Sequence, residues 1–192
     1  MTGIIGQNTG RASGIKKVVE VAGGGKVLQV VSGFEDDYAT HANTNVNSPA
    51  EILSVSITPS ATSSKVLLIG HIQGTATANF AYYGAILKRD STIIGSGDTS
   101  TRGATIGEAH CLSGQTGEGT YAYARPTPTL PITFLDSPSS TSAIAYKIFG
   151  FANHFAGSLS NRTFVQNGSG YNYANLEEAV ATTALTLYEI GV

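Results

Sequence analysis

A polar turn phrase occurs twice in this sequence, and each copy leads into a short apolar run. Residues 59–64, rich in serine and threonine after Pro59, precede the run 65–69. Residues 138–143, similar in composition after Pro138, precede the run 144–148. Each copy also follows another strand-like segment, so the sequence predicts two hairpins of similar design. Two such hairpins favour an antiparallel β-sandwich and indicate no chemistry.

The rest of the chain continues this β pattern. Leu53, Val55 and Ile57 alternate with polar residues and should share one face of a strand. Further strands are predicted at 26–31, 66–72, 80–88, 93–94, 129–135, 143–151, 163–166 and 184–190. These make about eight to ten strands with no long amphipathic helix, although 176–180 could form one helical turn. We therefore predict an all-β fold, an antiparallel β-sandwich of jelly-roll type, over residues 26–192.

Residues 1–25 have a different composition, with glycines punctuating short apolar pairs. Such a segment is too glycine-rich to fold alone, because ordering glycine costs the most backbone entropy. It would be held either on its own domain or between subunits of an assembly. We predict an extended N-terminal attachment arm, whose candidate contacts to a particle are Ile4, Ile5, Arg11, Ile15 and Val18.

Composition excludes several classes of function. Only 12% of the residues are charged, the net charge is −2, and the basic residues are scattered, so nucleic-acid binding is not expected. We expect no membrane span and no signal peptide, since no apolar run is long enough and the N-terminus lacks a basic start. Cys111 is the single cysteine, so no internal disulfide can form. A surface of hydroxyls and amides suits a subunit that packs against copies of itself.

Two predicted strands carry apolar residues on both faces. In 143–151, Tyr146 lies on one face and Phe149 and Phe151 lie on the other. In the last strand, Tyr188 and Ile190 lie on the face opposite its leucines. One face belongs in the core, and the other needs either a neighbouring subunit or loops of the same chain. We predict that Tyr146, Phe149, Phe151, Tyr188 and Ile190 form a subunit interface.

The sequence contains no recognisable catalytic or metal-binding constellation. The four histidines are far apart, and His110 and Cys111 are adjacent, so on a strand they would point to opposite faces. We therefore predict no catalytic residue, no metal and no cofactor, and the chain is not expected to be an enzyme. The densest acidic group, Glu35 to Asp37, could bind Ca²⁺ in a loop, although calcium needs six to eight oxygens; the alternative is a solvated loop.

Four tyrosines lie in predicted polar loops: Tyr121, Tyr123, Tyr171 and Tyr173. Tyrosines spaced two apart on a rim can stack on sugar rings, which makes host polysaccharide a possible ligand. Tyrosines are also enriched at protein interfaces, so subunit contact is an equal interpretation.

Several motifs resemble a module of tailed-bacteriophage virion proteins. They are the runs 27–32 and 53–67, Leu87 to Thr92, the turn at Asp136 to Pro138 with Tyr146, and the closing Leu187 to Ile190. Residues 3–6 and 10–14 are similar to N-terminal attachment segments of phage fibre-like proteins. The module resembles the trimeric jelly rolls of the C1q and tumour-necrosis-factor type. There, the strands equivalent to 143–151 and to the last strand lie near the threefold axis.

The resemblance implies a homotrimeric virion structural protein, assembled with other virion proteins in the host cytoplasm. Because no long shaft precedes the domain, it favours a capsid decoration or cement protein seated directly on the particle. The alternative is a tail-fibre tip that recognises host surface carbohydrate.

Overall fold

The structure is a computed structural model, and it describes residues 25–42, 44, 47–76, 81–95, 129–154, 163–166 and 182–192. The elements within these residues are all β-strands: β1 (Lys26–Glu35), β2 (Ala39–Ala42), β3 (Ala50–Ile57), β4 (Lys65–Ala76), β5 (Ala81–Arg89), β6 (Thr92–Ile93), β7 (Thr129–Asp136), β8 (Ile144–His154), β9 (Thr163–Gln166) and β10 (Thr183–Gly191). Over this part of the chain, no helix is long and apolar enough to cross a membrane. The predicted helical turn at 176–180 lies outside the described residues.

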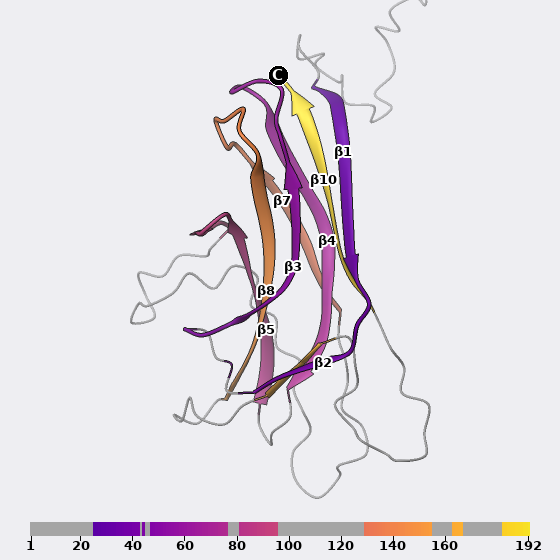
Figure 1. The fold of residues 1–192 in the computed structure, drawn as a ribbon, viewed down its shortest axis with the longest axis vertical. Coiled ribbons are helices and arrows are strands. Elements are labelled where there is room, and N and C mark those ends of the chain that lie inside the picture. The colour runs from indigo at the N-terminus through magenta and orange to yellow at the C-terminus, as the bar shows by residue number, and fades with distance from the viewer. Residues whose placement is uncertain are drawn as a thin grey trace, which may run out of the picture.

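The strands form two antiparallel sheets that pack face to face (Figure 1). One sheet runs in the order β1-β10-β4-β9-β2, with β7 also paired to β4, and the other runs β3-β8-β5-β6. If the short strands β2 and β9 are left aside, the first sheet joins the first, eighth, third and sixth strands of the chain. The second sheet joins the second, seventh, fourth and fifth. This alternation between sheets is the jelly-roll arrangement, so the predicted fold class is confirmed.

The two turn phrases do not close hairpins, and that prediction was wrong. β3 pairs with β8, whereas β4, which follows the first turn, pairs with β10 and β7. β7 and β8, on either side of the second turn, likewise belong to different sheets. Each connection, 58–64 and 137–143, therefore carries the chain across the roughly 10 Å between two packed sheets. The composition predicted the turns, but it does not determine whether the strands on either side of a turn are hydrogen-bonded to each other.

The core lies between the sheets and is built from alternate residues of each strand. Leu53, Val55 and Ile57 of β3 are buried on the predicted face, and Leu185 and Leu187 of β10 meet them from the other sheet. The sheets approach closely where β1 crosses β3, since a Cβ added at Gly33 would lie 2.7 Å from Val55 Cγ2. Period-two alternation therefore identified which residues face inward.

β2 was not predicted, because the polar stretch 34–49 contains no apolar run to mark a strand. Its pairing with β9 is supported by side chains. His41 Nε2 and Gln166 Oε1 lie 3.1 Å apart, and the His41 ring stacks on Phe164 with the ring centroids 6.0 Å apart. In Figure 1, β2 lies across one end of the sandwich. Polar contacts to another strand, invisible in the local sequence, thus define this element.

Candidate functional site

A row of four apolar side chains crosses the outer face of the first sheet. The pairing register places Val30 of β1 opposite Tyr188 of β10, Tyr188 opposite Leu67 of β4, and Leu67 opposite Leu135 of β7. Their neighbours along each strand face the core, where Val66, Leu68 and Leu187 are buried, so these four point away from it. We call Val30, Tyr188, Leu67 and Leu135 the outer apolar row.

The outer apolar row is open to solvent in the single chain. Val30 is 53% and Leu135 51% exposed, and Ile69, one position further along the outer face of β4, is 44% exposed. On β4, β7 and β10 the outward positions carry no carboxylate, and their basic side chains are Lys65 and His71. A sheet face that is both apolar and nearly free of charge is typical of a surface that another protein covers.

The five predicted interface residues do not lie on one surface. Tyr188 and Ile190 lie partly exposed on the outer face of the first sheet, in agreement with the predicted alternation in the last strand. Tyr146 and Phe151 are each 0% exposed within the single chain. Tyr146 faces the core, and Phe151 lies across Gly84 of β5, where an added Cβ would be 2.5 Å from the ring. Both side chains therefore have no surface to offer a second subunit.

Phe149 lies on the outer face of the second sheet, away from Tyr188 and Ile190. Lys88 Nζ sits 4.2 Å from the centre of the Phe149 ring, a cation–π contact that covers part of the ring. Beside it, Lys147 Nζ bonds Glu51 Oε2 at 3.0 Å. This face is consequently more polar than the face that carries the outer apolar row.

A buried carboxylate fastens the first turn phrase to the last strand. Glu189 is 1% exposed, and its Oε1 accepts hydrogen bonds from Ser60 N at 2.7 Å, Ser60 Oγ at 2.6 Å and Ser64 Oγ at 2.7 Å. Its Oε2 accepts from Gln29 Nε2 at 2.7 Å. Burial by itself raises the pKa of Glu189, but these donors outweigh burial and lower the pKa from its usual 4.5 to about 2.

A second carboxylate holds the start of the second turn. Asp136 ends β7 and accepts two bonds from Arg89 Nη1, at 3.0 and 2.9 Å, and one from the Tyr146 hydroxyl at 2.7 Å. Burial, and then this hydrogen bond to Asp136, raise the pKa of Tyr146 well above its usual 10.0. Because Arg89 and Tyr146 belong to the other sheet, the cluster ties the two sheets together at this end.

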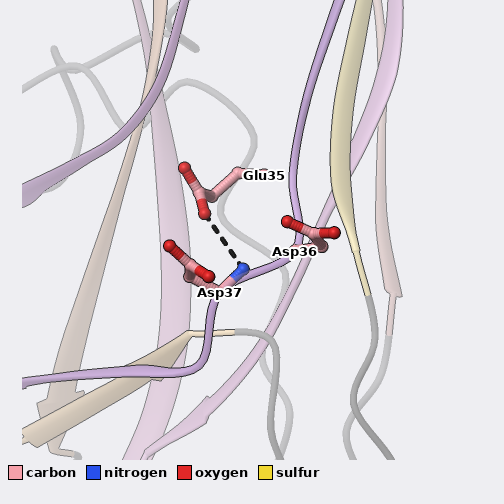
Figure 2. Close-up of side chains that lie close together, drawn as sticks. All are labelled: Glu35, Asp36 and Asp37. Atoms are coloured by element: carbon pink, nitrogen blue, oxygen red, sulfur yellow. Dashed lines mark hydrogen bonds between the residues drawn. The ribbon is translucent and has the colours of Figure 1, made fainter.

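The acidic group at the end of β1 is compact. Oxygen atoms of Glu35, Asp36 and Asp37 all lie within 4.8 Å of one another. Figure 2 shows that Glu35 Oε1 accepts a bond from the main-chain nitrogen of Asp37, 3.0 Å away. Gln166 Nε2 donates to Asp37 O at 3.2 Å, which joins this bend to β9. Ca²⁺ takes six to eight oxygens and three carboxylates hold six at most, so calcium binding here stays a prediction. The observed contacts of the group shape the bend.

The remaining predicted site residues lie outside the described residues. They are the arm residues Ile4, Ile5, Arg11, Ile15 and Val18, and the loop tyrosines Tyr121, Tyr123, Tyr171 and Tyr173. Cys111 and His110 also lie outside them. Particle attachment by the arm and sugar stacking by the tyrosines therefore stay predictions.

Sequence reasoning missed Val30, Leu67 and Leu135 as surface residues. Part of the signal was visible, because β1 carries Val27, Leu28, Val30 and Val31 in succession and a strand can bury only one face in a sandwich. What the sequence did not show is that β1, β10, β4 and β7 are neighbours. Only the register aligns their outward residues in one row.

Comparison with known proteins identifies no family for this chain. No protein-family model matches it, and no curated protein matches it. Among solved structures, it is similar to the structure of the Gt strain of infectious bursal disease virus, with 13% identity over 84% of this chain and 39% of that chain, at a TM-score of 0.46. The virus-derived T=1 particle gives 13% identity over 84% of this chain and 39% of that chain, at a TM-score of 0.43. The VP2 subviral particle gives 14% identity over 84% of this chain and 37% of that chain, at a TM-score of 0.42.

The chain thus spans about two fifths of the length of these viral proteins. A likeness this weak implies nothing about function. The assignment of the fold rests on the strand pairing within this chain.

Proposed function

We propose that this chain is a non-enzymatic structural subunit of a bacteriophage virion, a homotrimeric jelly roll that decorates the particle. The observation that carries the proposal is the outer apolar row, which crosses four neighbouring strands and is about half exposed at Val30 and Leu135. The sequence resemblance to trimeric jelly-roll modules of phage virion proteins supplies the kind of assembly. The low content of charge is consistent with close packing against copies of the same chain.

Association through this face is favourable on physical grounds. Complete burial of an exposed aliphatic or aromatic side chain contributes roughly 1.5–3 kcal/mol. Val30 and Leu135 are about half exposed, whereas Leu67 and Tyr188 are partly buried. Each subunit therefore gains roughly 1 kcal/mol for Val30 and for Leu135 when a neighbour covers them, and less for the other two. The partly exposed Tyr188 and Ile190 belong to this surface, which keeps them in the proposed interface, together with Val30, Leu67 and Leu135. Tyr146 and Phe151 are not part of it.

Replacing Leu135 with arginine tests the interface. Leu135 is exposed at the edge strand β7, so the folded chain should accept the substitution while the apolar contact becomes a buried charge. We expect Leu135→Arg to abolish trimers in size-exclusion chromatography with light scattering, with an unchanged circular dichroism spectrum. Ser54→Arg is the matched control, because Ser54 is exposed on a strand of the other sheet. Trimers that persist in Leu135→Arg would contradict this interface.

The proposed role of the arm requires a separate experiment. We propose that residues 1–25 fasten the trimer to capsid or tail subunits. A chain that begins at Lys26 keeps all of β1, so it should still fold and form trimers. Added to particles that lack the protein, it should fail to bind where the full chain binds. Full decoration by the shortened chain would assign attachment to the jelly roll itself.

A further inference from the structure

β1 is the edge strand of the first sheet as far as the structure describes it. Its side away from β10 is a second surface, besides the outer apolar row, that could bind another chain. Among the described strands, β1 pairs with β10 alone (Figure 1). It is ten residues long. Natural edge strands are usually short, or are protected by proline or by charges along their length, because open N–H and C=O groups recruit another strand. β1 has no proline and carries no charge between its first and last residues.

The two charges of β1 stand at opposite ends and have opposite signs. Lys26 begins the strand and Glu35 ends it. Between them, Val27 is 56%, Leu28 49% and Phe34 70% exposed. An antiparallel partner with the same sequence would therefore bring a Glu35 to each Lys26 and a Phe34 to each Val27. The strand is complementary to itself.

We propose that the edge of β1 pairs with β1 of a second copy of this chain across a twofold axis. In an antiparallel pair, opposed residues share a face. With Val31 opposite its own copy at the axis, Gln29 faces Gly33. β1 bulges between Val27 and Gln29, so Leu28 is one extra residue. Beyond the bulge, Val27 therefore faces Phe34 and Lys26 faces Glu35, and two ion pairs close the ends of the joined strands.

This contact is distinct from the threefold interface of the proposed function. The outer apolar row uses a sheet face, whereas β1 pairing uses main-chain groups at a sheet edge and joins the first sheets of two subunits. Together the two contacts would link neighbouring trimers into a network over a particle surface. The twofold contact exists whether or not the threefold contact forms, so the two can fail independently.

Charge reversal provides the test, with the full chain in sedimentation velocity over a concentration series. Exposed ion pairs contribute little individually, but the twofold axis makes two of them, and reversal turns attraction into repulsion. We expect Lys26→Glu to weaken association through β1 about tenfold, and Glu35→Lys to do the same. The double variant K26E/E35K should restore the wild-type association. Restoration separates this role from misfolding, since Glu35 Oε1 also accepts a bond from Asp37 N.

Glu51→Lys is the control, because Glu51 is an exposed carboxylate on the second sheet and should leave association through β1 unchanged. Leu135→Arg should abolish trimers and leave the β1 dimer, which separates this inference from the proposed function. Failure of the double variant to restore association would overturn the proposal. The proposal would also be overturned if a chain lacking residues 1–24 lost the β1 contact while the charge variants kept it. The arm would then occupy the edge of β1.

Discussion

The four hydrogen bonds received by Glu189 predict a specific dependence of stability on this one carboxylate. In Glu189→Gln, Oε1 can still accept from the serines, but the charge that strengthens those bonds is gone. The new amide nitrogen faces Gln29 Nε2, so two donors meet where a bond existed. Gln29 cannot rotate its oxygen inward without losing its bond to Thr58 O at 2.7 Å. The first turn is therefore expected to loosen from β10.

The magnitude follows from the pKa of Glu189. A fall from 4.5 to about 2 corresponds to about 3 kcal/mol at about 1.4 kcal/mol for each pKa unit. Because glutamine at position 189 can still accept from the serines, only part of this is lost, and we expect a fall of about 2 kcal/mol in the free energy of unfolding. For a chain of this size, that is a fall of about 4–8 °C in Tm.

The pH dependence has a definite sign. Because the folded pKa lies below the unfolded one, the stabilisation is complete above about pH 4.5 and is lost as the pH falls towards 2. The difference between wild type and Glu189→Gln should therefore be full at pH 7, smaller at pH 3 and absent only below pH 2. Urea unfolding followed by tyrosine fluorescence measures this difference in the free energy of unfolding, since the chain has nine tyrosines and no tryptophan. Protein concentration must be equal throughout, because self-association adds to apparent stability.

Glu51→Gln is the matched control for this experiment. Glu51 is also a carboxylate on a strand and is paired to Lys147, but its side chain is 44% exposed. An exposed pair contributes at most about 1 kcal/mol, so this variant should unfold close to wild type. Equal stability of Glu189→Gln and wild type at pH 7, or a difference that does not shrink at pH 3, would refute the assignment of Glu189 as the anchor of the turn.

Two further substitutions test packing between the sheets. Tyr146→Phe removes the hydroxyl that donates to Asp136 and should lower the free energy of unfolding by about 1–2 kcal/mol, seen as a lower urea midpoint at unchanged m; an unchanged midpoint would mean that Arg89 alone satisfies Asp136. Gly150→Ala would place a Cβ against Phe164 Cε1 and should lower the free energy of unfolding by about 1–3 kcal/mol. Adding Phe164→Leu should recover part of this loss. If the losses of the two substitutions simply add, the strain lies elsewhere.

Local patterns predicted the strands well because alternation records burial directly. Leu53, Val55 and Ile57 read as one buried face, and they are. The order of the strands in the sheets was not in the local pattern. Both turn phrases precede strands, but residues of β3 pair with residues 87 to 100 positions away in β8. Residues of β4 pair with residues 56 to 70 positions away in β7, or with β10 at the far end of the chain. Sheet partners are fixed by long-range contacts, which no window of sequence contains.

The candidate interface shows the same limit. Alternation placed Phe149 and Phe151 on a face opposite the core, which is correct, but it does not reveal what covers that face. Gly84 lies opposite Phe151 on β5 and leaves room for its ring, which is fully buried. Phe149 has Ile86 opposite it and remains partly exposed beneath Lys88. The two aromatic side chains therefore differ in exposure although they alternate onto the same face.

At the end of the sandwich that carries the two turns, buried carboxylates and outward apolar side chains occupy adjacent positions on the same strands. Glu189 and Asp136 flank Val66 of β4 in a single inward-facing row, and each holds one of the turns. Their immediate neighbours Tyr188 and Leu135 face outward in the outer apolar row. Because adjacent residues of a strand point to opposite faces, substitutions at the inward row should change stability and leave association intact. Substitutions at the outward row should do the reverse. The turns are thus fixed from inside the sheet, and the outer face of β4, β7 and β10 carries no carboxylate that would oppose contact with another subunit.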